Sequence, residues 1–313
     1  MTDARHDAHA SLTARAALAS VAVAFLLLAL KLFAVWKTGS VAMLGSLADT
    51  ALDVAASLIT LFGVRVAAMP ADHDHRFGHG KAESIAAFVQ VGIITVSAFA
   101  IGWRAVERLM QGAETSHAEY GIGVSLVAIA ATLALVAYQG SVVRRTGSVA
   151  IGTDRLHYQS DLLLNLAVVA ALVLDQFLGF AGADPLFGLG IAAWLLIGAW
   201  RASSHALDQL MDKEWPDARR RAFVAVAARH PEGRGIHDFR TRTSGAHEFA
   251  QFHMWVDPQM TVARAHDVME EIEADLAREF PGVEVLIHLD PEGQVDRPDD
   301  PLAERDETEG LRE

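Results

Sequence analysis

The chain has 313 residues, of which 52% are apolar and 21% are charged, and its mean hydropathy is +0.24. These values exclude an ordinary soluble enzyme and indicate a membrane protein with a soluble part. Most of the formal charge of −13 lies toward the C-terminus, because residues 1–210 carry 13 basic and 15 acidic groups whereas the remaining 103 residues carry 13 and 24. This acidic balance excludes the basic face of a nucleic-acid-binding protein.

Cysteine is absent from the chain, whereas histidine occurs 14 times. The sequence therefore excludes disulfides, thiolate nucleophiles and cysteine-bound zinc or iron–sulfur sites. Any metal chemistry must use imidazole and carboxylate ligands.

Six apolar runs are long enough to cross a membrane, because about 20 helical residues span a hydrocarbon core of about 30 Å. They cover residues 18–36, 41–68, 82–110, 120–143, 149–180 and 185–207. The first run is too long for a secretory signal peptide, and the segment before it is too mixed in charge. Lys and Arg concentrate before the first run, after the second, after the fourth and after the sixth, which predicts that both termini are cytoplasmic.

The pattern after residue 210 is that of a small soluble domain. We expect helices over residues 216–229 and 261–280, the second capped by Thr261, and strands over 236–242, 249–256 and 283–289. The predicted fold class is an α-helical membrane protein with six transmembrane helices in residues 1–210, followed by a cytoplasmic α+β domain of order αββαβ in residues 211–293. The acidic segment 294–313 has almost no apolar residues and is predicted to be disordered.

Ionisable side chains inside the second and fifth runs are the strongest functional signal. Each run carries a pair at i, i+4 spacing, which places both side chains on one helix face: Asp49 with Asp53, and His157 with Asp161. Burying such groups costs about 2.5–3.5 kcal/mol each, and three carboxylates without a Lys or Arg partner repel one another. A metal ion or protons must supply the missing positive charge, and three carboxylates with one imidazole are the four ligands of a tetrahedral Zn²⁺ site. For a single intramembrane Asp the alternative is a packed helix contact, and Lys31 in the first run is expected to snorkel toward the membrane surface.

Two further sets of potential metal ligands lie outside the apolar runs. The loop after the second run contains Asp72, His75 and His79, with His73 and Asp74 as additional candidates, although a solvated polar loop is the alternative. The soluble domain carries a scattered set for which spacing alone favours no function, namely His237, His253, His266, His288 and Asp290.

Five motifs in the same order along the chain resemble those of the cation diffusion facilitator family, in its bacterial branch of zinc and ferrous-iron efflux proton antiporters. They are GSLADTALDVAAS, PADHDHRFGHGKAES, DRLHYQSDLLLN, IHDFRTRTSG and IHLDP. The resemblance extends from the first apolar run to about Pro291. It implies a homodimer with a metallochaperone-like cytoplasmic domain, an interlock between Lys81 and Asp212 at the membrane surface, and an apolar gate at Leu156.

The resemblance also implies three metal sites. The transport site corresponds to Asp49, Asp53, His157 and Asp161, and the loop site corresponds to Asp72, His75 and His79. The cytoplasmic binuclear site corresponds to His237, His253, His266, His288 and Asp290, with Asp290 bridging two ions, which reverses the interpretation from spacing. Leu289 departs from the polar residue that the family has at this position.

The function that the resemblance implies is export of a divalent cation across the bacterial cytoplasmic membrane by proton antiport with alternating access. Zn²⁺ is the first expected cargo, with Fe²⁺ or Cd²⁺ next, and the chain is expected to be no enzyme and to need no cofactor beyond bound divalent metal. A metal sensor that does not transport is expected to lack one of the four intramembrane ligands. A channel would need several weak sites along a polar pore, and a membrane hydrolase would need a nucleophile with a base.

Overall fold

The computed structural model describes residues 2–38, 41–111, 122–178, 182–232, 234–294, 299 and 305–308. The chain forms two compact units, one of Ala8–Asp208 and the other of Gln209–Glu313 with Met1–Asp7.

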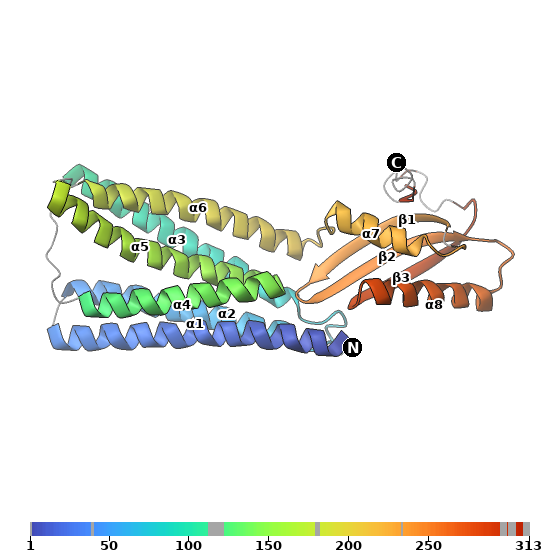
Figure 1. Ribbon diagram of the computed structural model, residues 1–313, viewed down its shortest axis with the longest axis horizontal. Helices are drawn as coiled ribbons and strands as arrows, with labels where there is room; N and C mark the ends of the chain where they lie inside the picture. Colours follow the sequence, from blue (N-terminus) through green and yellow to red (C-terminus); the bar gives the residue numbers. More distant parts are fainter. Residues whose placement is uncertain are drawn as a thin grey trace. The chain divides into compact units, whose positions relative to one another are not determined.

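The first unit consists of six long helices (Figure 1). They are α1 (Thr2–Thr38), α2 (Val41–Ala67), α3 (Lys81–Gln111), α4 (Ile122–Thr146), α5 (Val149–Leu178) and α6 (Ala183–Leu210). Over their described residues, all of them except α5 are long and apolar enough to cross a membrane. Helix α5 has 30 residues and is long enough to span, but Asp154, Arg155, His157 and Asp161 interrupt its apolar character. The structure therefore confirms a helical membrane region with five apolar spanning helices, and α5 has the length of a sixth.

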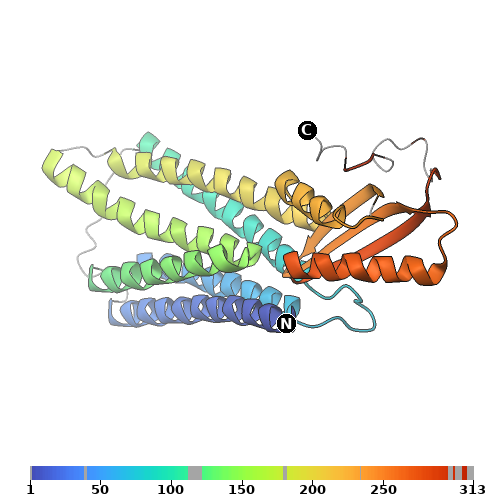
Figure 2. The same cartoon turned by 45° about the vertical axis from the view of Figure 1, so that its right-hand side comes forward.

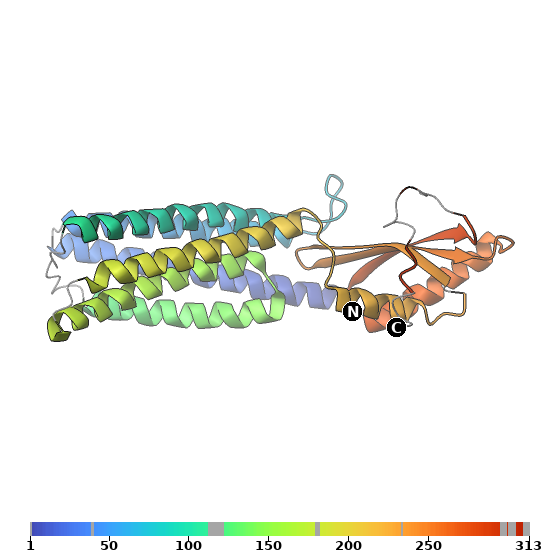
Figure 3. The same ribbon diagram turned by 90° about the horizontal axis from the view of Figure 1, so that it is seen from above.

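Apolar side chains pack these helices together in several clusters. One cluster joins α1, α2, α4 and α5 through Ala16, Ala17, Leu61, Val64, Val142, Ala150 and Ile151. Another joins α3 and α6 through Val91, Ile94, Ala98, Leu195 and Ala199, with Leu156 of α5 packed against it. A small third cluster joins α3, α5 and α6. Helices α1, α2 and α4 accordingly lie together in Figure 2, whereas α3 runs beside α6 in Figure 3. The helices that carry the predicted transport ligands, α2 and α5, both contribute to the first cluster.

The second unit confirms the predicted αββαβ order. Its elements are α7 (Asp217–Ala227), β1 (Arg234–Ser244), β2 (His247–Val256), α8 (Val262–Glu279) and β3 (Val283–Pro291). Strand β2 lies in the middle of the sheet, antiparallel to β1 and parallel to β3. The Thr261 hydroxyl accepts a hydrogen bond from the backbone N–H of Arg264 at 3.3 Å, so the predicted N-cap of α8 is confirmed.

Both helices of this unit cover the same face of the sheet (Figure 3). Ala250, Phe252 and Met254 of β2 are buried in one core with Phe223 of α7 and with the apolar stripe of α8. Because side chains alternate along a strand, His253 points to the opposite face. The sheet thus presents its polar, ligand-bearing face away from the helices.

Part of the acidic C-terminal segment contacts this unit. The backbone N–H of Glu307 donates to the carbonyl oxygen of Ile236 at 2.8 Å, and Arg220 donates to Glu307 Oε1 at 3.3 Å. A carboxylate of the segment thus has a guanidinium partner on α7 at residues 305–308, and the disorder expected for 294–313 stays a prediction. Most of the remaining segment lies outside the described residues.

Gly235 provides a test of the packing around β1. Its φ is +52°, and a Cβ atom there would lie 1.9 Å from the Trp255 ring. We expect Gly235→Ala to destabilise the cytoplasmic domain by about 2–4 kcal/mol, since strain and overpacking add. Hydrogen exchange of β1 and β2 in the full-length protein measures this loss. Gly293→Ala is the control, because Gly293 has φ +91° but open space around it; equal effects of the two variants would refute the steric explanation.

Candidate metal centres

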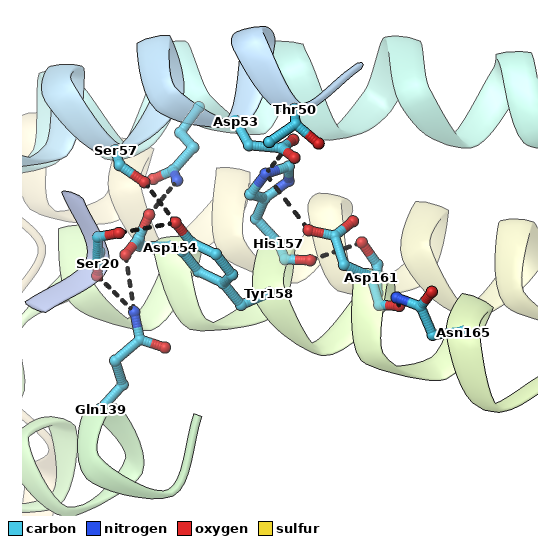
Figure 4. A network of polar contacts seen from close by, with 12 residues as sticks. Ser20, Thr50, Asp53, Ser57, Gln139, Asp154, His157, Tyr158, Asp161 and Asn165 are labelled. Carbon is cyan, nitrogen blue, oxygen red and sulfur yellow. Dashed lines mark hydrogen bonds and ion pairs between the residues drawn. The ribbon is translucent and has the colours of Figure 1, made fainter. Parts of the chain in front are cut away.

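Three of the four predicted transport ligands converge between α2 and α5 (Figure 4). His157 Nε2 lies 3.0 Å from Asp53 Oδ1 and 3.8 Å from Asp161 Oδ2. One potential ligand atom from each residue lies within 4.8 Å of the other two. The side chains of His157, Asp53 and Asp161 are 6%, 20% and 32% exposed, respectively. The i, i+4 spacing on α5 thus yields two ligands on one face, opposed by a carboxylate of α2.

Asp49, the fourth predicted ligand, lies one turn before Asp53 on α2. Its side chain is exposed, and it is not a member of the three-residue group. Residues at i and i+4 are displaced along a helix by about 6 Å, so a single imidazole on the facing helix contacts only one of the two carboxylates. Participation of Asp49 in a four-ligand site stays a prediction.

Lys31 has a side-chain partner on the neighbouring helix. Its Nζ donates a hydrogen bond to Thr50 Oγ1 at 2.5 Å, and Thr50 precedes Asp53 by three residues on α2. The ammonium therefore contacts a hydroxyl of α2, and its snorkelling toward the membrane surface stays a prediction. Hydropathy did not reveal this contact, because Thr50 can be identified as a partner of Lys31 only once α1 is known to lie beside α2.

The loop between α2 and α3 brings Asp72, His75 and His79 together as predicted. Asp72 Oδ2 lies 3.3 Å from His79 Nε2, and Asp72 Oδ1 lies 3.5 Å from His75 Nδ1. The two imidazole rings are 4.6 Å apart, between centroids. Gly78, at φ +77°, provides the left-handed turn between them. One ligand atom from each residue lies within 4.8 Å of the others, which fits a small cation.

The conformation of this loop depends on the charged form of Asp72. The backbone N–H of His75 donates to Asp72 Oδ1 at 2.7 Å and that of Asp74 donates at 2.9 Å, and these bonds hold the pKa of Asp72 below its usual value of 3.8. Because the pKa is lowered, the stabilisation is present above pH 3.8 and is lost as the pH falls through the folded-state value. The carboxylate is therefore preformed as a ligand at neutral pH.

The cytoplasmic cluster arises from the register of the sheet. His237 on β1 pairs with His253 on β2, which in turn pairs with His288 on β3. The rings of His253 and His288 are 4.5 Å apart, and those of His237 and His253 are 5.4 Å apart. Three imidazoles from three strands thus form a ladder across the sheet.

Asp290 connects this ladder. Its Oδ2 lies 2.8 Å from His253 Nδ1 and 3.3 Å from His237 Nε2, whereas its Oδ1 lies 3.2 Å from His288 Nε2. His237 Nδ1 donates to the carbonyl oxygen of Gly235 at 2.7 Å, which leaves Nε2 free to act as a ligand. A carboxylate with both oxygens on different imidazoles has the geometry of a bridging ligand.

Two details differ from the predicted cytoplasmic set. His266 lies on the exposed side of α8, where its Nε2 is 3.2 Å from Glu270 Oε1, and it is outside the cluster of His237, His253 and Asp290. Asp238, which the sequence analysis did not single out, lies 3.7 Å from His253 Nε2. Asp238 has a φ of +45°, an uncommon backbone conformation next to His237 that marks this position and that the sequence does not reveal.

Sequence reasoning also missed Asp154, although it precedes His157 by three residues on α5. Its side chain is fully buried and accepts hydrogen bonds from Gln90 at 2.9 Å and from Gln139 at 2.7 Å. Its place as an ionisable residue inside a predicted span could have identified Asp154 as a functional candidate.

A six-helix membrane unit with facing carboxylate and imidazole ligands, joined to an αββαβ unit with a second set of such ligands, defines a membrane protein that handles metal cations. Comparison with known proteins gives the same class. The family model described as the cation efflux transmembrane domain matches residues 17–211, and that of the cation efflux protein cytoplasmic domain matches residues 215–292.

Relatives of known name cover nearly the whole chain. The cation-efflux pump FieF of Cronobacter sakazakii is 43% identical over 93% of this chain and 97% of its own length, and that of Pectobacterium atrosepticum is 43% identical over 92% and 95%. Among solved structures, the metal-bound C-terminal domain of the CzcD transporter from Thermotoga maritima is 27% identical, covering 26% of this chain and all of its own, with a TM-score of 0.25. The chain therefore belongs to the cation diffusion facilitator family of cation efflux transporters.

The cytoplasmic cluster provides a second test. We expect Asp290→Asn to weaken Zn²⁺ binding at this cluster more than tenfold, because the variant removes the charged oxygen that joins three imidazoles, and even loss of an outer-shell partner costs about 10–100-fold. Equilibrium dialysis of the full-length protein measures the number of ions bound and their affinity. Asp257→Asn, at an exposed position after β2, is the control. Unchanged Zn²⁺ binding in Asp290→Asn would contradict the assignment.

Proposed function

We propose that this chain exports a divalent cation, with Zn²⁺ as the first candidate, in exchange for protons. The single observation that carries the proposal is the convergence of Asp53, His157 and Asp161 inside the helical unit. Asp49, one turn away on α2, would complete a four-ligand site in one of the transport conformations. A transport cycle requires this site to face one side of the membrane and then the other.

Competition between metal and protons explains the exchange. A metal ion binds deprotonated imidazole and carboxylates, so each bound ion displaces protons from the same lone pairs. On the side with lower proton activity the ligands are deprotonated and bind metal. On the side with higher proton activity, protons occupy the ligands and the metal leaves. An imidazole suits this role, since its ordinary pKa of about 6.5 lies close to physiological pH.

The donor set favours Zn²⁺ over harder cations. Carboxylates alone suit Mg²⁺, Ca²⁺ or Mn²⁺, whereas imidazole with carboxylates suits Zn²⁺ and also accepts Fe²⁺, Cd²⁺ or Co²⁺. Zn²⁺ is therefore our first assignment and Fe²⁺ our second.

The remaining assignments concern orientation and assembly. We place both termini in the cytoplasm and the chain in the bacterial cytoplasmic membrane, on the distribution of Lys and Arg around the helices. The acidic cytoplasmic unit carries its His ladder on the sheet face without helices, which supports a homodimer held in part by bound metal. An interlock between Lys81 and Asp212, and a role of the Asp72, His75 and His79 loop in metal delivery, belong to the same proposal.

The transport site can be tested by metal flux. We expect Asp53→Ala to lower the rate of Zn²⁺ uptake into proteoliposomes more than tenfold, because it removes the α2 ligand nearest His157 and a ligand contributes at least as much as an outer-shell partner. Zn²⁺, Cd²⁺, Fe²⁺ and Mn²⁺ are compared under an imposed pH gradient. Asp217→Ala, at an exposed position on α7, is the control. Wild-type flux in Asp53→Ala would refute the site.

Proton coupling is tested separately. We expect His157→Ala to reduce the number of protons moved per metal ion and to flatten the dependence of flux on the pH gradient, since one titrating ligand is lost. A pH-sensitive dye and a Zn²⁺-sensitive dye inside the same vesicles measure the ratio. If the ratio and its pH dependence are unchanged, His157 is not the coupling residue.

A further inference from the structure

A buried group of polar side chains lies directly beside the transport ligands. We call it the inner polar layer, and it consists of Ser20, Ser57, Thr60, Gln90, Gln139 and Asp154. Each of these side chains belongs to a residue that is at most 1% exposed, although all lie within membrane-spanning helices. Polar groups at this depth cost free energy unless they are paired, so a layer of six in one place indicates a role beyond filling space.

Asp154 is the centre of the layer. Gln90 Nε2 on α3 donates to one carboxylate oxygen at 2.9 Å, and Gln139 Nε2 on α4 donates to the other at 2.7 Å. Gln139 also donates to Ser20 Oγ on α1 at 3.0 Å. One side chain of α5 is thereby joined to three other helices.

Tyr158 and Thr60 extend these connections to α2. The Tyr158 hydroxyl donates to the carbonyl oxygen of Ser20 at 3.0 Å and lies 2.8 Å from Ser57 Oγ. Thr60 Oγ1 donates to Gln90 Oε1 at 3.0 Å. Gln90 is therefore bonded at both ends of its amide, to α2 and to α5, which are the two helices that carry the transport ligands.

Gln90 joins α3 to both helices that carry the transport ligands. Its partner Thr60 lies on α2 and its partner Asp154 lies on α5. Apolar contacts between helices are non-directional, whereas hydrogen bonds hold one relative position. The bonds of Gln90 consequently favour the arrangement seen here over one in which α3 has shifted against α2 and α5.

The layer closes one side of the transport ligands. Ser57 lies one turn after Asp53, toward the end of α2 that leads into the loop of residues 68–80. Asp154 lies one turn before His157, toward the start of α5, which follows the end of α4 that carries Arg144 and Arg145. On the other side Asp161 keeps a third of its side chain exposed, and Asp49 and Asn165 are exposed. Figure 4 shows Asp161 and Asn165 on the side of His157 away from Asp154 and Gln139. The ligands are thus covered by buried side chains on the side of the layer, whereas exposed polar side chains lie on the other side.

We propose that the inner polar layer is the cytoplasmic gate of the transport path and that Gln90 is its positioning residue. The inference rests on the proposed alternating access and orientation. In the cytoplasm-facing conformation the bonds from Gln90 to Thr60 and Asp154 are broken, α3 shifts away from α2 and α5, and the cation reaches Asp53 and His157 past Asp154. The bonds re-form when the gate closes.

The natural absence of cysteine allows a direct test by single-cysteine labelling. Ser84→Cys is a near-isosteric reporter, because Ser84 is buried in the first turn of α3, on the cytoplasmic side of the layer. Its alkylation by a membrane-impermeant maleimide in inside-out vesicles reports opening toward the cytoplasm. The measurement needs no metal flux, so its failure and the failure of the proposed antiport are distinguishable.

The chain offers a matched pair of variants. Thr60→Val removes the bond between α2 and α3 without changing shape, whereas Thr95→Val removes a bond to the Val91 carbonyl within α3 itself. We expect labelling to accelerate about threefold in Thr60→Val and about fivefold to tenfold in Gln90→Leu, the shifts that follow from losing one and two interhelical hydrogen bonds in a membrane. Thr95→Val should label at the rate of the unmodified background, and the apparent KM for metal supplied from the cytoplasmic side should fall in parallel with the labelling gain.

A role exchange separates gating from general stability. Asp154→Asn alone should accelerate labelling, because its new NH₂ group faces the amide NH₂ groups of Gln90 and Gln139, which also donate. In the combined variant with Gln90→Glu, the amide at position 154 donates to the carboxylate at position 90, which reverses the roles of the two residues. Labelling should return to within about twofold of the background, since the lost interhelical bond is re-formed. Equal labelling in Thr60→Val and Thr95→Val, or no recovery in the combined variant, would overturn the proposal.

Discussion

The contact between His157 on α5 and Asp53 on α2 is the interaction on which the proposed transport site depends. It places an imidazole and two carboxylates within a few ångströms of one another inside an apolar helix bundle. Such a set is costly without added positive charge, because the interior screens like charges poorly. Under the proposed function the same cost would make the site an exchanger, since a metal ion and protons are alternative ways to neutralise the same ligands.

Polar groups beside this site give the bundle its specificity. Apolar clusters hold the six helices together, and apolar surfaces tolerate sliding. The buried bonds of Asp154, Gln90 and Gln139 select one position. Interhelical hydrogen bonds in membranes average only about 0.6 kcal/mol, so a few of them bias a conformation without locking it. A transporter needs this balance, because it must occupy two conformations in turn.

The cytoplasmic unit assembles ligands by a different route. Strand pairing, and not helix spacing, aligns His237, His253 and His288, and Asp290 on β3 reaches all three. The helices cover the other face of the sheet and supply the core that keeps the strands in register. A rigid apolar layer on one side and ligands on the other is an arrangement in which bound metal can join two copies without altering either core.

The sequence by itself determined the six long helices of the first unit, the αββαβ order, the Thr261 cap and the pairing of His157 with Asp161, because each of these follows from periodicity or spacing over a few residues. It did not distinguish Asp53, which faces His157, from Asp49, which does not, and it did not reveal the bond between Lys31 and Thr50. Spacing alone did not join His237, His253 and His288, which only the family resemblance grouped, and the layer around Asp154 was unrecognised. These features depend on how helices are rotated against one another and on the parallel pairing of β2 with β3, which arise from contacts between distant segments. Local patterns carry no information on such contacts, so only the tertiary structure decided which polar residues meet.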